Sequence, residues 1–168
     1  FTVENGKIRF GLLAVKNVGA GVIDAIVKAR KEKGKFVSYT DFCEKVDTQE
    51  INKRAIESLI RCGAFDGLGA NRAQLLAIYE KVLDGIQQER RRNLDGQISL
   101  FQSFEDALSD TLKEDVLPQV EELHPKRLLA MEKEVLGFYI SGHPLAEFEE
   151  EIKNISTIYT TELAELGE

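Results

Sequence analysis

The sequence predicts a mainly α-helical fold: a tandem helix-hairpin-helix region, with a short N-terminal β-hairpin before it and a C-terminal helical segment after it. Two glycine-rich bends, Val18–Gly21 and Gly63–Gly69, each lead directly into a helical apolar repeat. The alternating residues around Asn5-Gly6 are typical of a two-residue β-turn. At 168 residues, the chain is long enough for one or two small cores.

Residues typical of helix starts and stops predict the helices of the first unit. After the first bend, apolar residues at helical spacing predict a helix that ends near Lys33-Gly34, where glycine favours a helix stop. The following Ser38 and Asp41 predict the cap of a short helix. The apolar positions of these two helices are Val22, Ile23, Ile26, Val27, Phe42, Cys43 and Val46.

The second unit repeats the order of helix, bend and helix, with a longer bend. Asp47 with Glu50 predicts a capping box for its first helix, and Asn71 predicts the cap of its second. Two such units bury one another's apolar faces. Their apolar positions are Ile51, Ala55, Ile56, Leu59 and Ile60 in one helix, and Leu75, Leu76, Tyr79, Val82, Leu83 and Ile86 in the other.

The helical spacing of apolar residues weakens from about Glu89 to Leu123. This segment is therefore predicted to be a flexible connector that is partly ordered at most. A helix resumes after Pro125 and stops at Gly137, and it runs through Leu128, Leu129, Glu132, Val135 and Leu136. A short acidic helix and a strand-like tail follow. We therefore predict three parts: a tandem helix-hairpin-helix region at 1–93, an acidic linker at 94–122 and a C-terminal helical part at 123–168.

The net charge of −7 conceals a division along the chain. Residues 1–93 contain 17 Lys and Arg against 12 Asp and Glu, whereas residues 94–168 contain 5 against 17. Such asymmetry favours a local anion-binding face in the first part. Cys43 and Cys62 predict reduced thiols, with no zinc spacing. We also expect no membrane span, a cytoplasmic location, and a longer parent chain, because the first residue is not Met.

The first bend carries the main candidate site. Backbone N–H groups at the start of a helix, together with the helix dipole, bind a phosphate oxygen without reading a base. Val18 is expected to anchor the bend in the core, while Gly19 and Gly21 permit close approach and positive φ. An ordinary helical corner is the alternative. The predicted DNA-binding residues here are Lys16, Asn17, Val18, Gly19, Ala20, Gly21 and Lys28.

The second bend is a further candidate, with Asp66 expected to oppose an anion. The alternative is a purely structural role as the pseudo-symmetric partner of the first bend. If the second bend contacts DNA, the residues expected to do so are Arg61, Gly63, Gly67, Gly69 and Arg72.

An apolar group lies in the polar connector at Gln97-Ile98-Ser99-Leu100-Phe101. Two adjacent large apolar side chains in such a segment suggest an anchor for a partner's pocket, although they could also fold onto the protein's own core. We find no catalytic constellation, because no P-loop, nucleophile elbow or zinc signature is present. His124 and His143 each precede Pro and have no second ligand at metal spacing, and His143 is interpreted as a turn residue.

Three segments together resemble a known family. Ile8–Gly19, Cys62–Asp66 and Leu136–Leu145 resemble, in the same order, parts of the alpha subunits of bacterial DNA polymerase III, the family C replicative polymerases. The last of these segments, Leu136-Gly137-Phe138-Tyr139-Ile140-Ser141-Gly142-His143-Pro144-Leu145, is highly specific. The resemblance covers nearly the whole chain.

The resemblance implies a tandem helix-hairpin-helix region that holds duplex DNA behind the polymerase active site. It also implies that Gln97, Ile98, Ser99, Leu100 and Phe101 form an internal sliding-clamp motif of the pattern Q-x-x-L/M-F. The implied partners are duplex DNA, the clamp and other replicase subunits. The parent is a nucleotidyltransferase that needs Mg²⁺, but the catalytic carboxylates have no counterpart here. A monovalent cation at the first bend is left open. Asn17 departs from the glycine usual in helix-hairpin-helix bends.

Two other functions compete with this interpretation. A purely structural connector between polymerase domains would touch no DNA. A base-excision glycosylase also uses this hairpin, with a catalytic Asp beyond it and a pocket for a flipped base. Asp41 lies at a broadly similar distance from the bend, but within a predicted helix cap.

Overall fold

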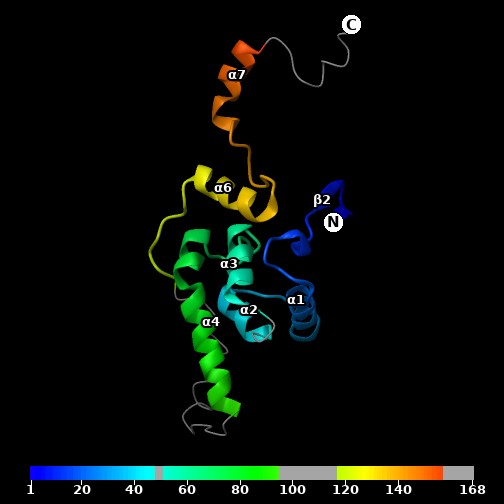
Figure 1. Cartoon of the computed structure of the whole chain (residues 1–168), viewed down its shortest axis with the longest axis vertical. Coiled ribbons are helices and arrows are strands. Elements are labelled where there is room, and N and C mark those ends of the chain that lie inside the picture. The colour runs from blue at the N-terminus through cyan, green and yellow to red at the C-terminus, as the bar shows by residue number, and fades with distance from the viewer. Residues whose placement is uncertain (48–50, 95–116, 157–168) are drawn as a thin grey trace.

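The computed structural model describes residues 1–47, 51–94 and 117–156. Helices α1 to α4 and α6 form one helical body, from which the end of α4 and the whole of α7 project in opposite directions (Figure 1). The mainly helical fold with an N-terminal hairpin is therefore confirmed.

The N-terminal hairpin pairs β1 (Thr2–Glu4) with β2 (Lys7–Arg9) in antiparallel register. Asn5 and Gly6 form the turn with φ values of 53° and 74°, which suit the left-handed positions of a tight hairpin. The hairpin leads into a single 3-10 turn, η1 (Leu12–Ala14), ahead of the first bend. The first helical element of the first unit, η1, is thus a single turn and much shorter than the helix that follows the bend.

The two helices of the N-terminal part begin and end where the sequence predicts. Helix α1 (Ala20–Lys33) ends at Gly34, which has a φ of 84°. Helix α2 (Tyr39–Lys45) is capped by Ser38, whose Oγ accepts the Asp41 N–H at 3.0 Å. A cap of this kind stabilises a helix by about 1 kcal/mol, which matters for a helix of only two turns.

The predicted start of the next helix is wrong. Helix α3 (Lys53–Arg61) is capped by Asn52, whose Oδ1 accepts the Ala55 N–H at 2.8 Å. Asp47 precedes the helix, Glu50 lies outside the described residues, and Ile51 is buried in the approach to α3. Asn52, which was not among the predicted caps, therefore forms the cap in place of Asp47.

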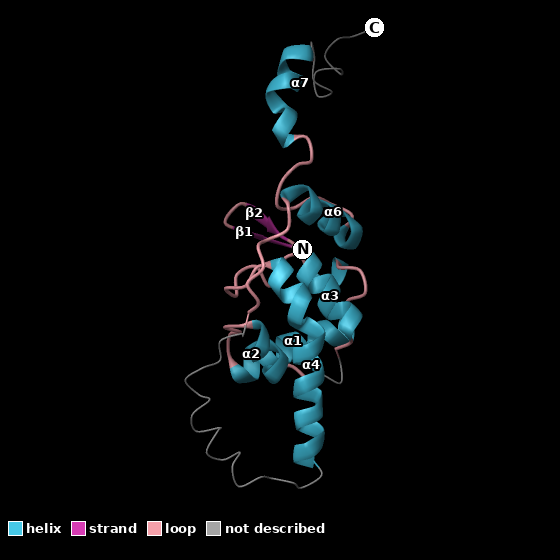
Figure 2. Ribbon diagram, turned by 90° about the vertical axis from the view of Figure 1, so that its left-hand side faces the viewer, coloured by secondary structure: helices cyan, strands magenta, loops and turns pink. Residues whose placement is uncertain are grey.

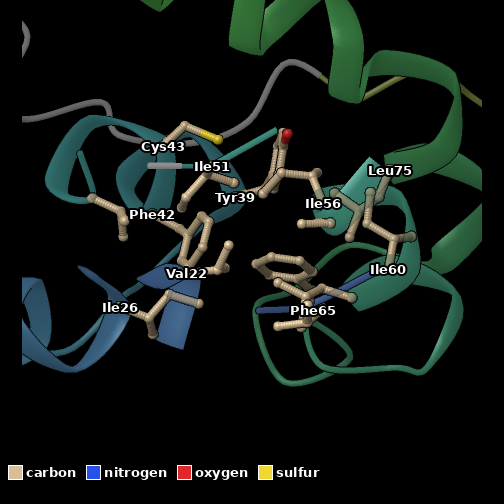
Figure 3. Packing of buried hydrophobic residues seen from close by; sticks show 14 of the residues in the cluster. Val22, Ile26, Tyr39, Phe42, Cys43, Ile51, Ile56, Ile60, Phe65 and Leu75 are labelled. Carbon is tan, nitrogen blue, oxygen red and sulfur yellow. The ribbon is translucent and has the colours of Figure 1, made fainter. Parts of the chain in front are cut away.

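The core lies where α1, α2, α3 and α4 (Arg72–Leu94) meet (Figure 3). Tyr39, Ile56, Leu59, Ile60 and Leu75 are almost completely buried there. Phe65, from the second bend, packs edge-to-face on Tyr39 and Phe42, with ring centroids 5.5 and 5.0 Å apart. The second bend is therefore anchored in the core through Phe65, while Asp66, Gly67 and Gly69 are exposed.

The predicted connector is wrong at both ends. Helix α4 continues through Leu94, and Leu117 packs partly against the core. Helix α6 (Pro125–Leu136) then ends at Gly137, which has a φ of 79°, as predicted. The division of the chain into three parts at 93 and 122 stays a prediction.

Beyond α6, the chain leaves the body (Figure 2). A 3-10 turn, η2 (Ala146–Phe148), is followed by α7 (Glu149–Ile155), and neither contains a buried residue. Across the described ranges, no helix is both long and apolar enough to span a membrane.

Candidate nucleic-acid interface

The first bend is anchored by two buried valines. Val15 and Val18 are 3% and 6% exposed, and the Val18 N–H donates to the Val15 carbonyl at 3.1 Å. Between them, Asn17 adopts a φ of 65°. Asn tolerates this left-handed conformation better than most residues, so it can take the place that glycine has in other bends of this kind.

The expectation of positive φ at Gly19 and Gly21 is wrong. Gly19 has φ −85° and ψ 169°, and Gly21 belongs to the first turn of α1. Asn17 makes the sharp reversal instead, so the two glycines need no unusual backbone angle. A Cβ added at Gly19 would meet nothing within 4 Å. The space in front of Gly19 is therefore open to a ligand.

The N-terminus of α1 is exposed and carries no side-chain cap. Gly19, Ala20 and Gly21 are all exposed, and the first described hydrogen bond of the turn runs from the Ile23 N–H to the Gly19 carbonyl at 3.3 Å. The N–H groups before Ile23 are those that an α-helix leaves without an internal partner. This is the arrangement in which helix N-termini bind anions.

Two contacts hold the first bend against the rest of the molecule. The Lys16 N–H donates to the Val135 carbonyl of α6 at 2.8 Å. The Asn17 Nδ2 donates to the Ser58 Oγ of α3 at 3.0 Å. The bend is thus fixed from two sides, while the side chain of Lys16 remains exposed.

The second bend has a different construction. Gly63 and Gly69 adopt φ values of 79° and 85°. A Cβ at Gly63 would collide with the guanidinium group of Arg72 and lie 2.6 Å from Asp66 Oδ2. Glycine is required at Gly63 by the protein's own packing, so it is no evidence for a bound phosphate.

Arg72 is buried in an ionic network, which contradicts its predicted contact with DNA. Its side chain is 5% exposed and pairs with Asp66 at 2.7 Å and with Glu132 of α6 at 3.0 Å. Glu132 is itself 1% exposed and also accepts the N–H groups of Ile140 and Ser141. Burial alone would raise the pKa of Glu132, but these hydrogen bonds outweigh it and lower that pKa. Two carboxylates thus neutralise Arg72.

The first turn of α4 is already occupied by the protein's own acceptors. Asn71 and Gln74 form a reciprocal capping box, with the Gln74 N–H 2.7 Å from Asn71 Oδ1. The carboxylate of Glu122 accepts the N–H groups of Arg72 and Ala73 at 2.8 and 3.0 Å. These hydrogen bonds outweigh the effect of burial and lower the pKa of Glu122. A carboxylate therefore occupies the position that a phosphate takes in an anion site.

Arg61 is also largely compensated. It forms ion pairs with Glu57 at 2.8 Å and with Glu134 of α6 at 2.9 Å. Lys28 is exposed on α1, in a groove of about 830 Å³ between α1 and α2 that is also lined by four carboxylates. Of the predicted cations, Lys16 is therefore the one that the structure places at the first bend with an exposed side chain.

The remaining sequence-based candidates fall into three groups. The predicted clamp motif, Gln97–Phe101, lies outside the described residues. Asp41 is fully buried and bound to Lys45 at 2.8 Å, so it cannot meet a flipped base as a glycosylase would require. His143 accepts the Leu145 N–H at its Nδ1, as a turn residue does.

Neither thiol nor metal chemistry is indicated in the part of the chain that the structure describes. Cys43 and Cys62 form no disulfide bond, and burial raises the pKa of the Cys62 thiol. No three His, Cys, Asp or Glu side chains of these residues cluster closely enough to hold a metal ion.

Sequence reasoning missed the roles of Glu122 and Glu132. Glu132 had a detectable signal, because it is the one charged residue among the inward positions of its helix, and a buried charge needs a partner. Glu122 had none, since a single glutamate in an acidic stretch cannot be distinguished from its neighbours.

Comparison with known proteins agrees with a helix-hairpin-helix fold. A family model described as "Helix-hairpin-helix motif" matches residues 1–75. DNA polymerase III subunit alpha of Saccharopolyspora erythraea is 41% identical over 148 residues, covering 86% of this chain and 12% of that protein. The subunits of the same name from Mycobacterium tuberculosis and Pseudomonas aeruginosa are 40% and 38% identical, covering 86% and 97% of this chain. This chain spans about an eighth of the length of the first relatives.

Proposed function

The chain belongs to the DNA polymerase III alpha-subunit family and corresponds to one segment of its members, and on that premise we propose that it binds the backbone of duplex DNA without reading sequence. The observation that carries the proposal is the exposed, uncapped N-terminus of α1 beside Lys16. Main-chain N–H groups bind a phosphate whatever the base sequence. They therefore supply affinity and position the protein on the duplex, but they do not distinguish one sequence from another.

We propose further that the parent protein is a DNA-directed DNA polymerase that requires Mg²⁺ and acts in chromosomal replication. Its relatives bear the name DNA polymerase III subunit alpha. A replicase must hold every duplex that it makes, so its DNA-binding site needs to accept any base sequence. Phosphate contacts alone meet that need.

Replacing Ala20 by Pro tests this function directly. Ala20 is the first residue of α1, where proline is tolerated, and Gly19 already has the extended backbone that a residue before proline requires. The variant loses one of the backbone N–H groups at the start of α1 that are proposed to bind phosphate, while the helix is retained. Ala20→Val is the matched control, because it adds a side chain of similar size and keeps the N–H group.

We expect Ala20→Pro to weaken binding of a short mixed-sequence duplex about tenfold, roughly the loss of one charge-assisted hydrogen bond. Ala20→Val should bind more tightly than Ala20→Pro, and circular dichroism should show both variants folded. Equal affinity of Ala20→Pro and the unmodified chain would instead support the alternative, a purely structural connector between polymerase domains.

A second proposed role is tethering to a sliding clamp through Gln97, Ile98, Ser99, Leu100 and Phe101. The support for this role is the sequence pattern, in which Leu100 and Phe101 follow a Gln by three and four residues. Paired large apolar side chains of this kind are typical anchors for a partner's pocket. Replacing Leu100 and Phe101 by Ala should abolish clamp binding in calorimetry and leave duplex binding unchanged. Unaltered clamp affinity would remove this role.

A further inference from the structure

A second basic side chain lies at the first bend, although it comes from a distant part of the sequence. A pocket of about 310 Å³ opens where the bend meets α3 and α6, and both Lys16 and Arg54 line it. Arg54 belongs to the first turn of α3, 38 residues after Lys16 in the sequence (54 minus 16). Only the packing of α3 against the bend brings the two cations to one pocket.

The charges of this pocket are unequally compensated. It also contains Arg61, Glu57 and Glu134, but both carboxylates are paired with Arg61, at 2.8 and 2.9 Å. Among the described residues, no ion pair is recorded for Lys16 or Arg54, and both are exposed. The three cations of the pocket exceed its two carboxylates by one positive charge, and Lys16 and Arg54 are the two cations that are not paired with those carboxylates.

The pocket is also held rigidly. The Lys16 N–H is bonded to α6, and the Asn17 side chain is bonded to Ser58 of α3, itself 3% exposed. Ser58 lies four residues after Arg54, one helical turn along α3. A site whose parts are already fixed loses less entropy when it binds. This gives Asn17 a second role beyond its left-handed backbone, because glycine could not make this bond.

We infer that Lys16 and Arg54 together bind one phosphate of the DNA backbone in this pocket, and that Asn17 is the positioning residue that holds the bend to α3. The inference deepens the proposed function and rests on it. It adds a side-chain phosphate site to the main-chain site at the start of α1, so that the first bend contacts the backbone through two different kinds of donor.

The test is duplex affinity of the whole chain over a series of salt concentrations. Arg54→Gln should weaken binding three- to tenfold and lower the slope of log K against log salt by about one, as expected for one lost phosphate contact. Arg127→Gln is the matched control, because Arg127 is exposed on α6 and lies eight residues, about 12 Å, from Val135. The control should stay within twofold of the unmodified chain.

Three further variants sharpen the test. If Lys16 and Arg54 share one phosphate, the double Gln variant should lose less affinity than the two single losses combined, whereas additive losses would overturn the shared pocket. Asn17→Gly, which keeps the backbone free to adopt positive φ, should also weaken binding, and Ser58→Ala should match it. Normal affinity in both of these variants would overturn the positioning role.

The outcomes separate the two proposals. If Ala20→Pro weakens binding and Arg54→Gln does not, the pocket inference fails and the proposed function stands. If neither variant changes affinity, the proposed function fails as well.

Discussion

Both bends are rich in glycine and precede a helix, but their charged groups differ: those of the first bend are exposed, and those of the second bind other groups of the protein. In the first bend the N-terminus of α1 is exposed, Lys16 projects from the surface, and the left-handed residue is Asn17. In the second bend, Glu122 occupies the N-terminus of α4 and Arg72 is buried between two carboxylates. A glycine-rich bend before a helix is therefore not enough to predict an anion site. What matters is whether the protein supplies its own anion there.

The proposed function therefore places DNA binding at the first bend and a structural role at the second. Helix α6 contacts both, through the Val135 carbonyl at the first bend and through Glu132 at the second. The second bend thereby fixes the position of α6, and α6 in turn holds Lys16. In the proposed function, the second bend supports the first bend through α6 and makes no contact with DNA of its own.

The largest effect should come from Arg72→Ala. Removing this side chain leaves Glu132 as an unpaired buried charge, which costs about 3–5 kcal/mol of unfolding free energy. Urea unfolding measures the loss, and Arg54→Ala, an exposed change, should remain within about 0.5 kcal/mol of the unmodified chain. A loss below about 1 kcal/mol for Arg72→Ala would mean that the network does not hold the second bend.

Gly63→Ala should be next in size. At a φ of 79° an alanine costs about 1–2 kcal/mol, and its Cβ would also displace the Arg72 guanidinium group. We expect thermal unfolding at a clearly lower temperature and unchanged duplex affinity of the folded protein. A fully stable Gly63→Ala protein would contradict the packing at this bend.

Gly19→Ala should show the reverse pattern. Its φ of −85° suits alanine, and nothing in the protein lies within 4 Å of the new Cβ. Gly19 is the N-cap of α1, where alanine is less favourable than glycine, and this opposes the gain from a less flexible unfolded chain, so the stability should change by less than about 1 kcal/mol. The methyl group would occupy the approach of the phosphate and weaken duplex binding several-fold. Gly67→Ala is the control, because its Cβ is equally unobstructed in the second bend. Equal affinity in the two variants would remove the distinction between the bends.

The smallest effect should be the acid sensitivity that Glu122 provides. Its folded-state pKa lies below the ordinary value of 4.5, so its contribution is complete above about pH 4.5 and is lost as the pH falls through the lower folded value. Because Glu122 is exposed, we expect less than about 1 kcal/mol. Glu122→Gln should therefore narrow the difference in stability between pH 7 and pH 4. An unchanged difference would contradict the role of the carboxylate.

Local signals in the sequence predicted most of the fold. The Asn5-Gly6 turn, the Ser38 and Asn71 caps and the stops at Gly34 and Gly137 are decided by a few neighbouring residues, and the structure confirms each of them. The predicted cap of α3 is wrong, because Asp47 was assigned to it and Asn52, five residues later, forms it.

The candidate site was less predictable, because its decisive contacts join residues far apart in the sequence. Arg72 meets Glu132 across 60 positions, and its first-turn N–H meets Glu122 across 50. Arg54 shows the opposite case. Its sequence position associates it with the second bend, but packing places it in the pocket of the first. A basic residue near a bend in the sequence is thus only a candidate, and the tertiary fold decides whether it is neutralised, buried or available.

Mapping the backbone amides of the isotopically labelled chain by NMR, during titration with a short duplex, tests the central claim most directly. The account predicts chemical-shift changes at Lys16 to Val22 and around Arg54, with the amides of Arg72 to Gln74 unaffected because Glu122 and Asn71 already occupy them. Changes centred on the first turn of α4, with the first turn of α1 silent, would contradict it.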